Sequence, residues 1–422
     1  MEKIINNKIN ETYYIETLDN GLRVIIWYKP LFANNICCFG TNFGAFDLHQ
    51  KVDNVDKRWL SGTAHFLEHK MFEDDNYVDI LNAFTDMGAL ANAFTSYKQT
   101  VYYFSTPNKD YRNCLNLLLD FVQQLKVSEQ SIEKEKGIIL SEHRMYKQDV
   151  DSVLNNEVFR SLYHYHPCIY DISGSEEDIS STTKEQLEDI YQVNYHPKNM
   201  ILSIVTNNDP NEVLNTIKEN QKDKIFVALE DIITVFDEEV EGVKEQYHQV
   251  KMDVASPKIA YNVKLQPISD RVKQEKYDWM MNMLMSEYFS PNSDVFQQWL
   301  DDQVINNSFY SYSILESNMF FLTFRCDMIS GDFAKKMEEQ ILNMKANGLD
   351  YQTIVRYQKK YLGKIISYLN TLEQLALGTM FAHFEGFNYF SDLEIIESIK
   401  EEDFAELLEL IDVKNYSIVE IV

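Results

Sequence analysis

The chain has 422 residues, of which 45% are hydrophobic and 25% are charged, a composition typical of a globular protein with two to three domains. Its formal net charge of −27 disfavours binding to nucleic acid or to an anionic membrane surface, so we expect neither partner. No apolar run approaches the ~18–20 residues of a membrane helix, and we predict no membrane span.

The cysteines indicate a reducing compartment. There are five of them, and none belongs to a C-x-x-C pair. The first residues lack an apolar core followed by small residues, so we expect no secretion signal. We therefore predict a cytoplasmic protein with buried or idle thiols: Cys37, Cys38, Cys114, Cys168 and Cys326.

The first half of the chain alternates strand and helix patterns. Strands are predicted where β-branched and aromatic residues gather: a hairpin over 13–27 around Asp19-Asn20-Gly21, then 36–41, a strand pair over 92–105, and 200–206. Helices are predicted where apolar residues recur at helical spacing: 61–72, 75–87, 110–124, 129–146 and 183–195.

The same rhythm returns after an acidic, lysine-rich segment at 208–250, where we expect the weakest packing and the connection between domains. Later elements are predicted as strands at 254–265, 309–325 and 416–422, and as helices at 273–288, 332–347 and 351–371. The fold class is therefore α+β, with two similar domains that each pack an antiparallel-rich sheet with helices. We place the first domain at 1–215, a connecting segment at 216–250 and the second domain at 251–422.

A metal-binding pattern lies in the predicted helix 61–72, as His65-Phe66-Leu67-Glu68-His69. On a helix, residues four apart lie on one face, so His65 and His69 can bind the same metal ion. Glu68 lies beside them and need not be a ligand. Because a catalytic zinc ion takes three protein ligands and keeps one open position, a third ligand must come from another segment.

The predicted helix 129–146 can supply that ligand. Glu135 and Glu142 are seven residues apart, two helical turns, and lie on nearly the same face. One carboxylate would complete the site and the other would support it. Such a site suits zinc and would also tolerate other divalent metals. The metal would activate water, and Glu68 would take the proton of the water and pass it to the leaving amine. The sequence predicts a Zn²⁺-dependent hydrolase.

These residues resemble the pitrilysin/insulinase-like zinc metallopeptidases, which include insulin-degrading enzyme and the mitochondrial processing peptidase. The resemblance extends over most of residues 13–205 and weakens beyond them. It rests on the H-x-x-E-H motif, on the E-x6-E spacing, and on further similar stretches: Gly88–Thr95, Thr100–Phe104, His166-Pro167 with Gly174, and Tyr195–Met200.

The resemblance implies a mitochondrial processing peptidase-like fold and a zinc endopeptidase. It implies that His65, His69 and Glu142 bind the metal, that Glu68 is the catalytic base, and that Glu135 supports catalysis. It also implies that Asn92, Ala93 and Phe94 lie on an edge strand that pairs with a peptide substrate. For Phe94 alone, core packing is an equal alternative. Short members of this family enclose flexible peptides between two chains, and some process ribosomally made peptides.

One departure from the family concerns its second domain. Relatives carry an Arg and a Tyr there that face the zinc, but this chain has Asp301 and Asp302 where the Arg is expected. Tyr310 or Tyr312 matches the Tyr weakly. We therefore hypothesise a heterodimer in which a related chain supplies the Arg and the Tyr. The alternative function is a non-catalytic subunit of a peptidase-like assembly.

Overall fold

The structure is a computed structural model that describes residues 1–73, 80–108, 110–327 and 331–422. Its internal contacts divide the chain into two compact units. The first unit comprises Met1–His143, Tyr170–Val235 and Ile365–Ser391. The second comprises Arg144–Ile169, Phe236–Lys364 and Asp392–Val422. The predicted boundaries at 215 and 251 treat each domain as one continuous segment, whereas these units are interleaved along the chain.

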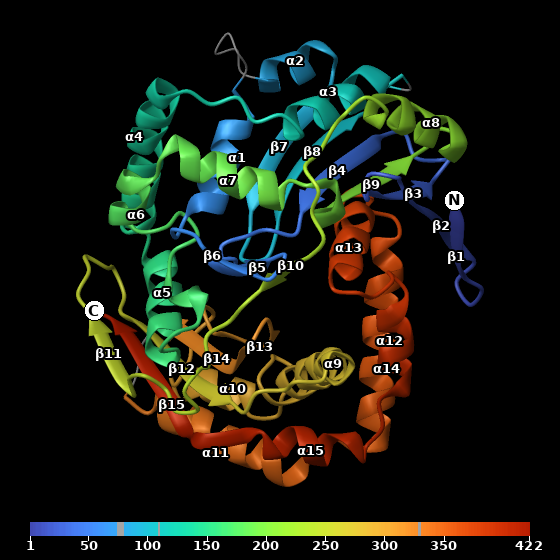
Figure 1. Cartoon of the computed structure of the whole chain (residues 1–422). Coiled ribbons are helices and arrows are strands. Elements are labelled where there is room, and N and C mark those ends of the chain that lie inside the picture. Colours follow the sequence, from blue (N-terminus) through green and yellow to red (C-terminus); the bar gives the residue numbers. More distant parts are fainter. Residues whose placement is uncertain (74–79, 109, 328–330) are drawn as a thin grey trace. The chain divides into compact units, whose positions relative to one another are not determined.

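A seven-stranded sheet forms the core of the first unit, in the order β1-β2-β3-β9-β4-β8-β7 (Figure 1). β3 and β9 run parallel, and the other neighbouring strands are antiparallel. β4 and β9 are buried along their whole length, which explains their largely apolar sequences. The strands are β1 (Glu2–Asn6), β2 (Glu11–Thr17), β3 (Arg23–Tyr28), β4 (Asn35–Thr41), β7 (Leu90–Thr95), β8 (Thr100–Thr106) and β9 (Met200–Thr206).

Helices pack on both faces of this sheet, because successive strand residues point to opposite sides. Phe39 of β4 belongs to the core that the sheet shares with helices α1, α3 and α7. On the other face, Trp27 of β3 donates its indole N–H to Thr379 of α13 over 2.9 Å. The helices of this unit are α1 (Thr63–Met71), α2 (Ile80–Asp86), α3 (Arg112–Val122), α6 (Glu176–Ser181), α7 (Lys184–Asn194), α8 (Pro210–Gln221) and α13 (Leu372–Phe384).

A smaller three-stranded sheet in the first unit has the order β10-β5-β6. It consists of β5 (His49–Val52), β6 (Val55–Arg58) and β10 (Ile232–Thr234). Asp47, just before β5, is buried and accepts hydrogen bonds from the backbone N–H of Gly44 and from the hydroxyl of Thr234. This carboxylate therefore links β10 to the loop that follows β4.

The second unit contains a five-stranded sheet in the order β11-β15-β12-β14-β13. Its strands are β11 (Tyr247–Val250), β12 (Lys258–Leu265), β13 (Tyr310–Glu316), β14 (Met319–Asp327) and β15 (Ile411–Ile421). Its helices are α5 (Val150–Leu162), α9 (Arg271–Tyr288), α10 (Phe296–Asp301), α11 (Phe333–Asn347) and α15 (Asp403–Glu409). Three more helices have residues in both units: α4 (Glu129–Tyr146), α12 (Tyr351–Tyr368) and α14 (Ser391–Ser398).

The predicted fold class is confirmed: helices pack on antiparallel-rich sheets in both halves of the chain. The hairpin predicted over 13–27 is β2 with β3, and the strand pair predicted over 92–105 is β7 with β8. Of the helix predicted at 75–87, the first part lies outside the described residues, and α2 covers the rest. Among the residues that the structure describes, no helix is long and apolar enough to cross a membrane.

The expectation of weak packing at 208–250 is wrong for its first part. Helix α8 lies there and buries Val213, Leu214 and Ile217. Asp209 caps the helix by accepting from the backbone N–H groups of residues 211 and 212, and Pro210 occupies its first turn. These two residues are a standard helix start, and the acidic composition of the segment obscured it.

Candidate metal centre

Helix α1, which carries the H-x-x-E-H motif, begins where two glycines allow close backbone contact. Gly62 and Gly174 have φ values of +81° and +88°. A Cβ on Gly62 would lie 2.2 Å from the carbonyl oxygen of Ser173, and a Cβ on Gly174 would lie 2.4 Å from that of Ser61. Only glycine fits both positions, so this contact fixes the start of the motif helix.

Helix α4 lies against the motif helix in the same core. Leu67 of α1 and Ile132 and Ile139 of α4 are all buried in one cluster. With these apolar residues in the core, the polar residues of the two helices meet at their boundary. The three predicted metal ligands lie there, together with Glu135.

The side chains of His65, His69 and Glu142 converge. The carboxylate Oε2 of Glu142 lies 3.7 Å from Nε2 of His65 and 3.5 Å from Nε2 of His69. One ligand atom from each residue lies within 4.8 Å of the others, and among the described residues this is the group of His, Cys, Asp or Glu side chains able to hold a metal ion. Ligands ~2.0–2.2 Å from a tetrahedral zinc ion stand roughly 3.3–3.6 Å apart, so these residues fit zinc.

Glu135 orients one of the two imidazoles. Its side chain is almost fully buried, and its Oε1 lies 3.0 Å from Nδ1 of His69. With Nδ1–H donating to this carboxylate, Nε2 of His69 faces Glu142 and is the nitrogen that a metal ion would bind. Burial raises the pKa of Glu135, but the hydrogen bonds of His69 and Lys70 outweigh it and lower that pKa overall. Glu135 therefore remains an anion beside the cluster.

The two histidines differ in their electrostatic surroundings. Burial lowers the pKa of His65 to about 4, which leaves this imidazole neutral near pH 7 and able to offer a lone pair. Burial also lowers the pKa of His69, but its hydrogen bonds to Glu135 and Glu142 outweigh that effect and raise the pKa to about 9. Partners of this kind increase the basicity of a metal ligand.

Glu68 faces the strand β7 and lies outside the ligand group. Its Oε2 accepts a hydrogen bond of 2.6 Å from the hydroxyl of Thr95, the last residue of β7. Burial raises the pKa of Glu68, and the Thr95 hydroxyl partly offsets that rise. A carboxylate with a raised pKa and a fixed orientation suits proton transfer. No functional role was predicted for Thr95 from its sequence context, although it directly follows Phe94 on the predicted strand.

Strand β7 lies at the end of the seven-stranded sheet, and within the described part of the chain it pairs with β8 alone, from Leu90 with Ser105 to Thr95 with Thr100. Asn92 is exposed, and Ala93 and Phe94 are partly exposed. Phe94 therefore does not belong to the buried core. The free side of β7 offers backbone groups that an extended peptide can pair with.

Two other histidines singled out by sequence have structural roles. His143 is 2% exposed, and its Nδ1 is 2.9 Å from the hydroxyl of Ser173, away from the ligand group. His166 stacks on Phe236, and its Nε2 donates to the carbonyl of Ser317 over 2.7 Å. Both residues stabilise packing.

The second unit contains an Arg–Tyr pair, Arg325 with Tyr312, of which only the Tyr was considered from the sequence. Arg325 of β14 donates to the hydroxyl of Tyr312 over 2.7 Å and to the side-chain oxygen of Asn155 over 3.0 Å. Arg325 is only 4% exposed, so its guanidinium is used within the unit. Asp301 ends helix α10 and accepts a hydrogen bond from the side chain of Gln297.

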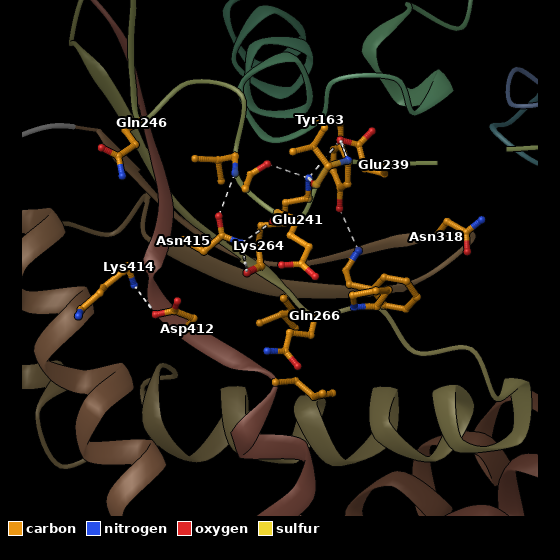
Figure 2. A pocket seen from close by; sticks show the side chains of 17 residues that line it. Tyr163, Glu239, Glu241, Gln246, Lys264, Gln266, Asn318, Asp412, Lys414 and Asn415 are labelled. Carbon is orange, nitrogen blue, oxygen red and sulfur yellow. Dashed lines mark hydrogen bonds and ion pairs between the residues drawn. The ribbon is translucent and has the colours of Figure 1, made fainter. Parts of the chain in front are cut away.

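A cavity of about 820 Å³ opens in the second unit, and none of the predicted site residues lines it (Figure 2). At its wall, the buried ammonium of Lys264 donates to Glu239 and to the backbone carbonyls of residues 162, 240 and 242. Its polar lining carries both signs of charge and several amides. These contacts hold the segment around Glu239 against β12.

Comparisons with known proteins match the two halves of the chain. Residues 54–175 match the family described as Insulinase (Peptidase family M16), and residues 181–361 match the Peptidase M16 inactive domain. The chain is 31% identical to "Uncharacterized zinc protease YmfH" of Bacillus subtilis, over 95% of this chain and 94% of that protein. It is 30% identical to the mitochondrial-processing peptidase subunit beta of Neurospora crassa over 44% of this chain and 38% of that protein.

A solved structure extends this likeness to three dimensions. The putative M16-like peptidase of Alicyclobacillus acidocaldarius superposes with a TM-score of 0.91 at 27% identity, covering 97% of this chain and 98% of that one.

Proposed function

Since the chain belongs to the insulinase family of peptidases, family M16, we propose that it is a zinc-dependent endopeptidase that cleaves flexible peptides. The observation that carries this proposal is the convergence of His65, His69 and Glu142 on one point. Glu68 lies on α1, the helix that carries the two histidines. The connections between these helices do not require the three side chains to converge, whereas binding of a metal ion does.

In this proposal His65, His69 and Glu142 would hold zinc, and Glu135 would orient His69. When bound, zinc lowers the pKa of a coordinated water and polarises the carbonyl of the scissile bond. The neutral imidazole of His65 and the anionic carboxylate of Glu135 beside the cluster suit a divalent cation. This match supports zinc rather than an anion as the occupant.

Glu68 is the proposed general base. Its carboxylate accepts the proton of the attacking water and returns it to the amine of the departing peptide. The hydroxyl of Thr95 holds one carboxylate oxygen, which leaves the other oxygen to exchange the proton. The reaction needs no covalent intermediate with the chain.

The substrate is proposed to bind as an additional strand along β7. Its backbone would pair with the free side of the strand, and Asn92, Ala93 and Phe94 would contact its side chains. Because pairing of this kind uses the backbone, it accepts many sequences but requires an extended and flexible peptide. Ribosomally made peptides that need processing meet this requirement.

A second chain is proposed to complete the enzyme by enclosing the peptide in a chamber. Asp301 and Asp302 stand where relatives have an Arg, and Arg325 is buried, so the substrate-anchoring Arg is expected from a related partner chain. One relative is itself named as a subunit of a peptidase, which supports an assembly of two chains.

The test compares peptide digests by mass spectrometry for wild type, Glu68→Gln and the control Glu133→Gln, an exposed carboxylate on α4. Each protein is assayed with and without a chelator, alone and with the chains that co-purify with it. We expect Glu68→Gln to retain zinc and lose cleavage, and Glu133→Gln to behave as wild type. Equal cleavage by Glu68→Gln and wild type would contradict the proposal, and so would a wild-type protein that binds no zinc.

A further inference from the structure

Lys70, which directly follows the metal-binding His69, has a fully buried side chain. A buried ammonium is strongly unfavourable unless other groups pair with it. The buried residues beside it on α1 include the apolar Phe66, Leu67 and Met71. The contacts that hold this lysine therefore indicate its role.

The ammonium of Lys70 contacts groups on two different segments. It lies 2.5 Å from Oε2 of Glu73, which follows α1, and 3.4 Å from the carbonyl oxygen of Ser131 on α4. It also lies 3.6 Å from Oε2 of Glu135 on α4. These partners fix the ammonium between the motif helix and the helix that provides the carboxylates.

Glu135 is shared between Lys70 and a proposed metal ligand. One carboxylate oxygen, Oε1, contacts Nδ1 of His69, and the other, Oε2, faces Lys70. A carboxylate held at one oxygen alone can rotate about its last bond. The ammonium on the opposite side limits this rotation and keeps Oε1 directed at the imidazole.

We propose that Lys70 is a positioning residue for the metal centre: it holds the Glu135 carboxylate so that His69 keeps Nε2 directed at the ion. This inference rests on the proposed function, because it requires zinc at His65, His69 and Glu142. Lys70 acts through Glu135 and touches neither the metal nor the substrate. The competing interpretation is that Lys70 only joins two helices.

The affinity for zinc distinguishes the two interpretations. The dissociation constant of Zn²⁺ is measured by competition with a coloured chelator, and the stability of the metal-free protein is measured in urea. Partners behind a metal ligand typically contribute 10- to 100-fold in affinity, and Lys70 is one step further away. We therefore expect Lys70→Met to weaken zinc binding about tenfold. Lys70→Arg, which keeps the charge, should restore at least part of this loss.

The same change in the Glu135→Gln background tests the route of the effect. If Lys70 acts through Glu135, Lys70→Met should weaken zinc binding no further in that background. Lys134→Met, an exposed lysine of α4, is the matched control and should leave affinity unchanged. Lys70→Gln is made in parallel in case Lys70→Met does not fold, because the glutamine amide can still donate to Ser131. It should show the same loss of zinc affinity.

A Lys70→Met or Lys70→Gln protein that is less stable in urea but binds zinc as tightly as wild type would overturn the proposal. The proposal would also be overturned if Lys70→Met weakened zinc binding in the Glu135→Gln background as much as it does in wild type. Wild-type protein that binds no zinc would instead reject the proposed function, so the two failures are distinguishable.

Discussion

Within the second unit, the carboxylate of Glu239 joins the segment before β11 to the loop that follows α5. Replacing it with glutamine tests how much this connection stabilises the unit. Oε1 accepts from the backbone N–H groups of His164 and Val240 and from Lys264, over 2.9, 3.1 and 3.2 Å. Oε2 accepts from the backbone N–H groups of Tyr165 and His166, over 2.9 and 3.0 Å. Both oxygens thus face hydrogen-bond donors.

A glutamine at position 239 has one oxygen and one NH₂ group. Its NH₂ faces two donors at the position of Oε2 and three at the position of Oε1, so at least two hydrogen bonds to a charged acceptor are lost. Each is typically ~1.5–3 kcal/mol. The side chain of Glu239 is 17% exposed, so we expect the lower end, a loss of about 3 kcal/mol from the free energy of unfolding of the second unit. That is a large part of the ~5–15 kcal/mol of a typical domain.

Urea unfolding and amide hydrogen exchange measure this effect. We expect a lower unfolding midpoint for Glu239→Gln and faster exchange of the backbone amides at 164–166. Glu241→Gln, an exposed carboxylate in the same segment, is the control and should change stability by less than about 0.5 kcal/mol. Unchanged exchange at 164–166 in Glu239→Gln would refute the reasoning.

The acid side of the stability curve gives a second measurement on the same pair. Burial raises the pKa of Glu239, but the backbone N–H groups and Lys264 lower it overall. A lowered pKa means that the carboxylate stabilises the folded state above its unfolded pKa and loses this effect as the pH falls through the folded pKa. The difference between wild type and Glu239→Gln should therefore shrink in acid.

Three further predictions concern the first unit. Thr95→Val removes the hydroxyl that donates to Glu68, and we expect kcat/KM for peptide cleavage to fall about 3- to 10-fold at unchanged zinc content; an unchanged kcat/KM would contradict this role. Gly62→Ala introduces a Cβ against the carbonyl of Ser173 at a positive φ, and calorimetry should show a loss of at least about 2 kcal/mol in the stability of the protein. The control is Gly137→Ala on α4, whose added Cβ meets no atom within 4 Å and should be tolerated. Burial raises the pKa of Asp47 to about 7, so this group favours folding at low pH and loses that contribution as the pH rises from about 4 to about 7. Asp47→Asn should therefore gain stability relative to wild type over that interval. Parallel curves of stability against pH for the two proteins would exclude this role of Asp47.

The fold class could be predicted because most of the elements carry a local pattern. The hairpin β2–β3, the strand pair β7–β8 and helix α4 each show the spacing and the turn residues of their type within one segment. Helix α8 was missed even though Asp209 and Pro210 mark its start, because the acidic composition of its surroundings suggested weak packing. The interleaving of the two units could not be predicted, because helix α13 packs on the sheet of the first unit through contacts with residues more than 300 positions away, such as Trp27 with Thr379.

The metal centre was easier to predict than the groups around it, and the reason is physical. His65, Glu68 and His69 lie on one helical turn, and Glu135 and Glu142 lie on one helix face, so spacing alone brings each set together. Thr95 and Lys70 depend on contacts between segments: Thr95 meets Glu68 only because β7 passes beside α1, and Lys70 meets Glu135 only because α1 and α4 share a core. Spacing within a helix thus identifies the candidate metal ligands, while the tertiary structure decides how firmly their side chains are held. The sensitivity of zinc affinity to Lys70 and Glu135 is therefore the point at which this fold, rather than the motif, can be tested.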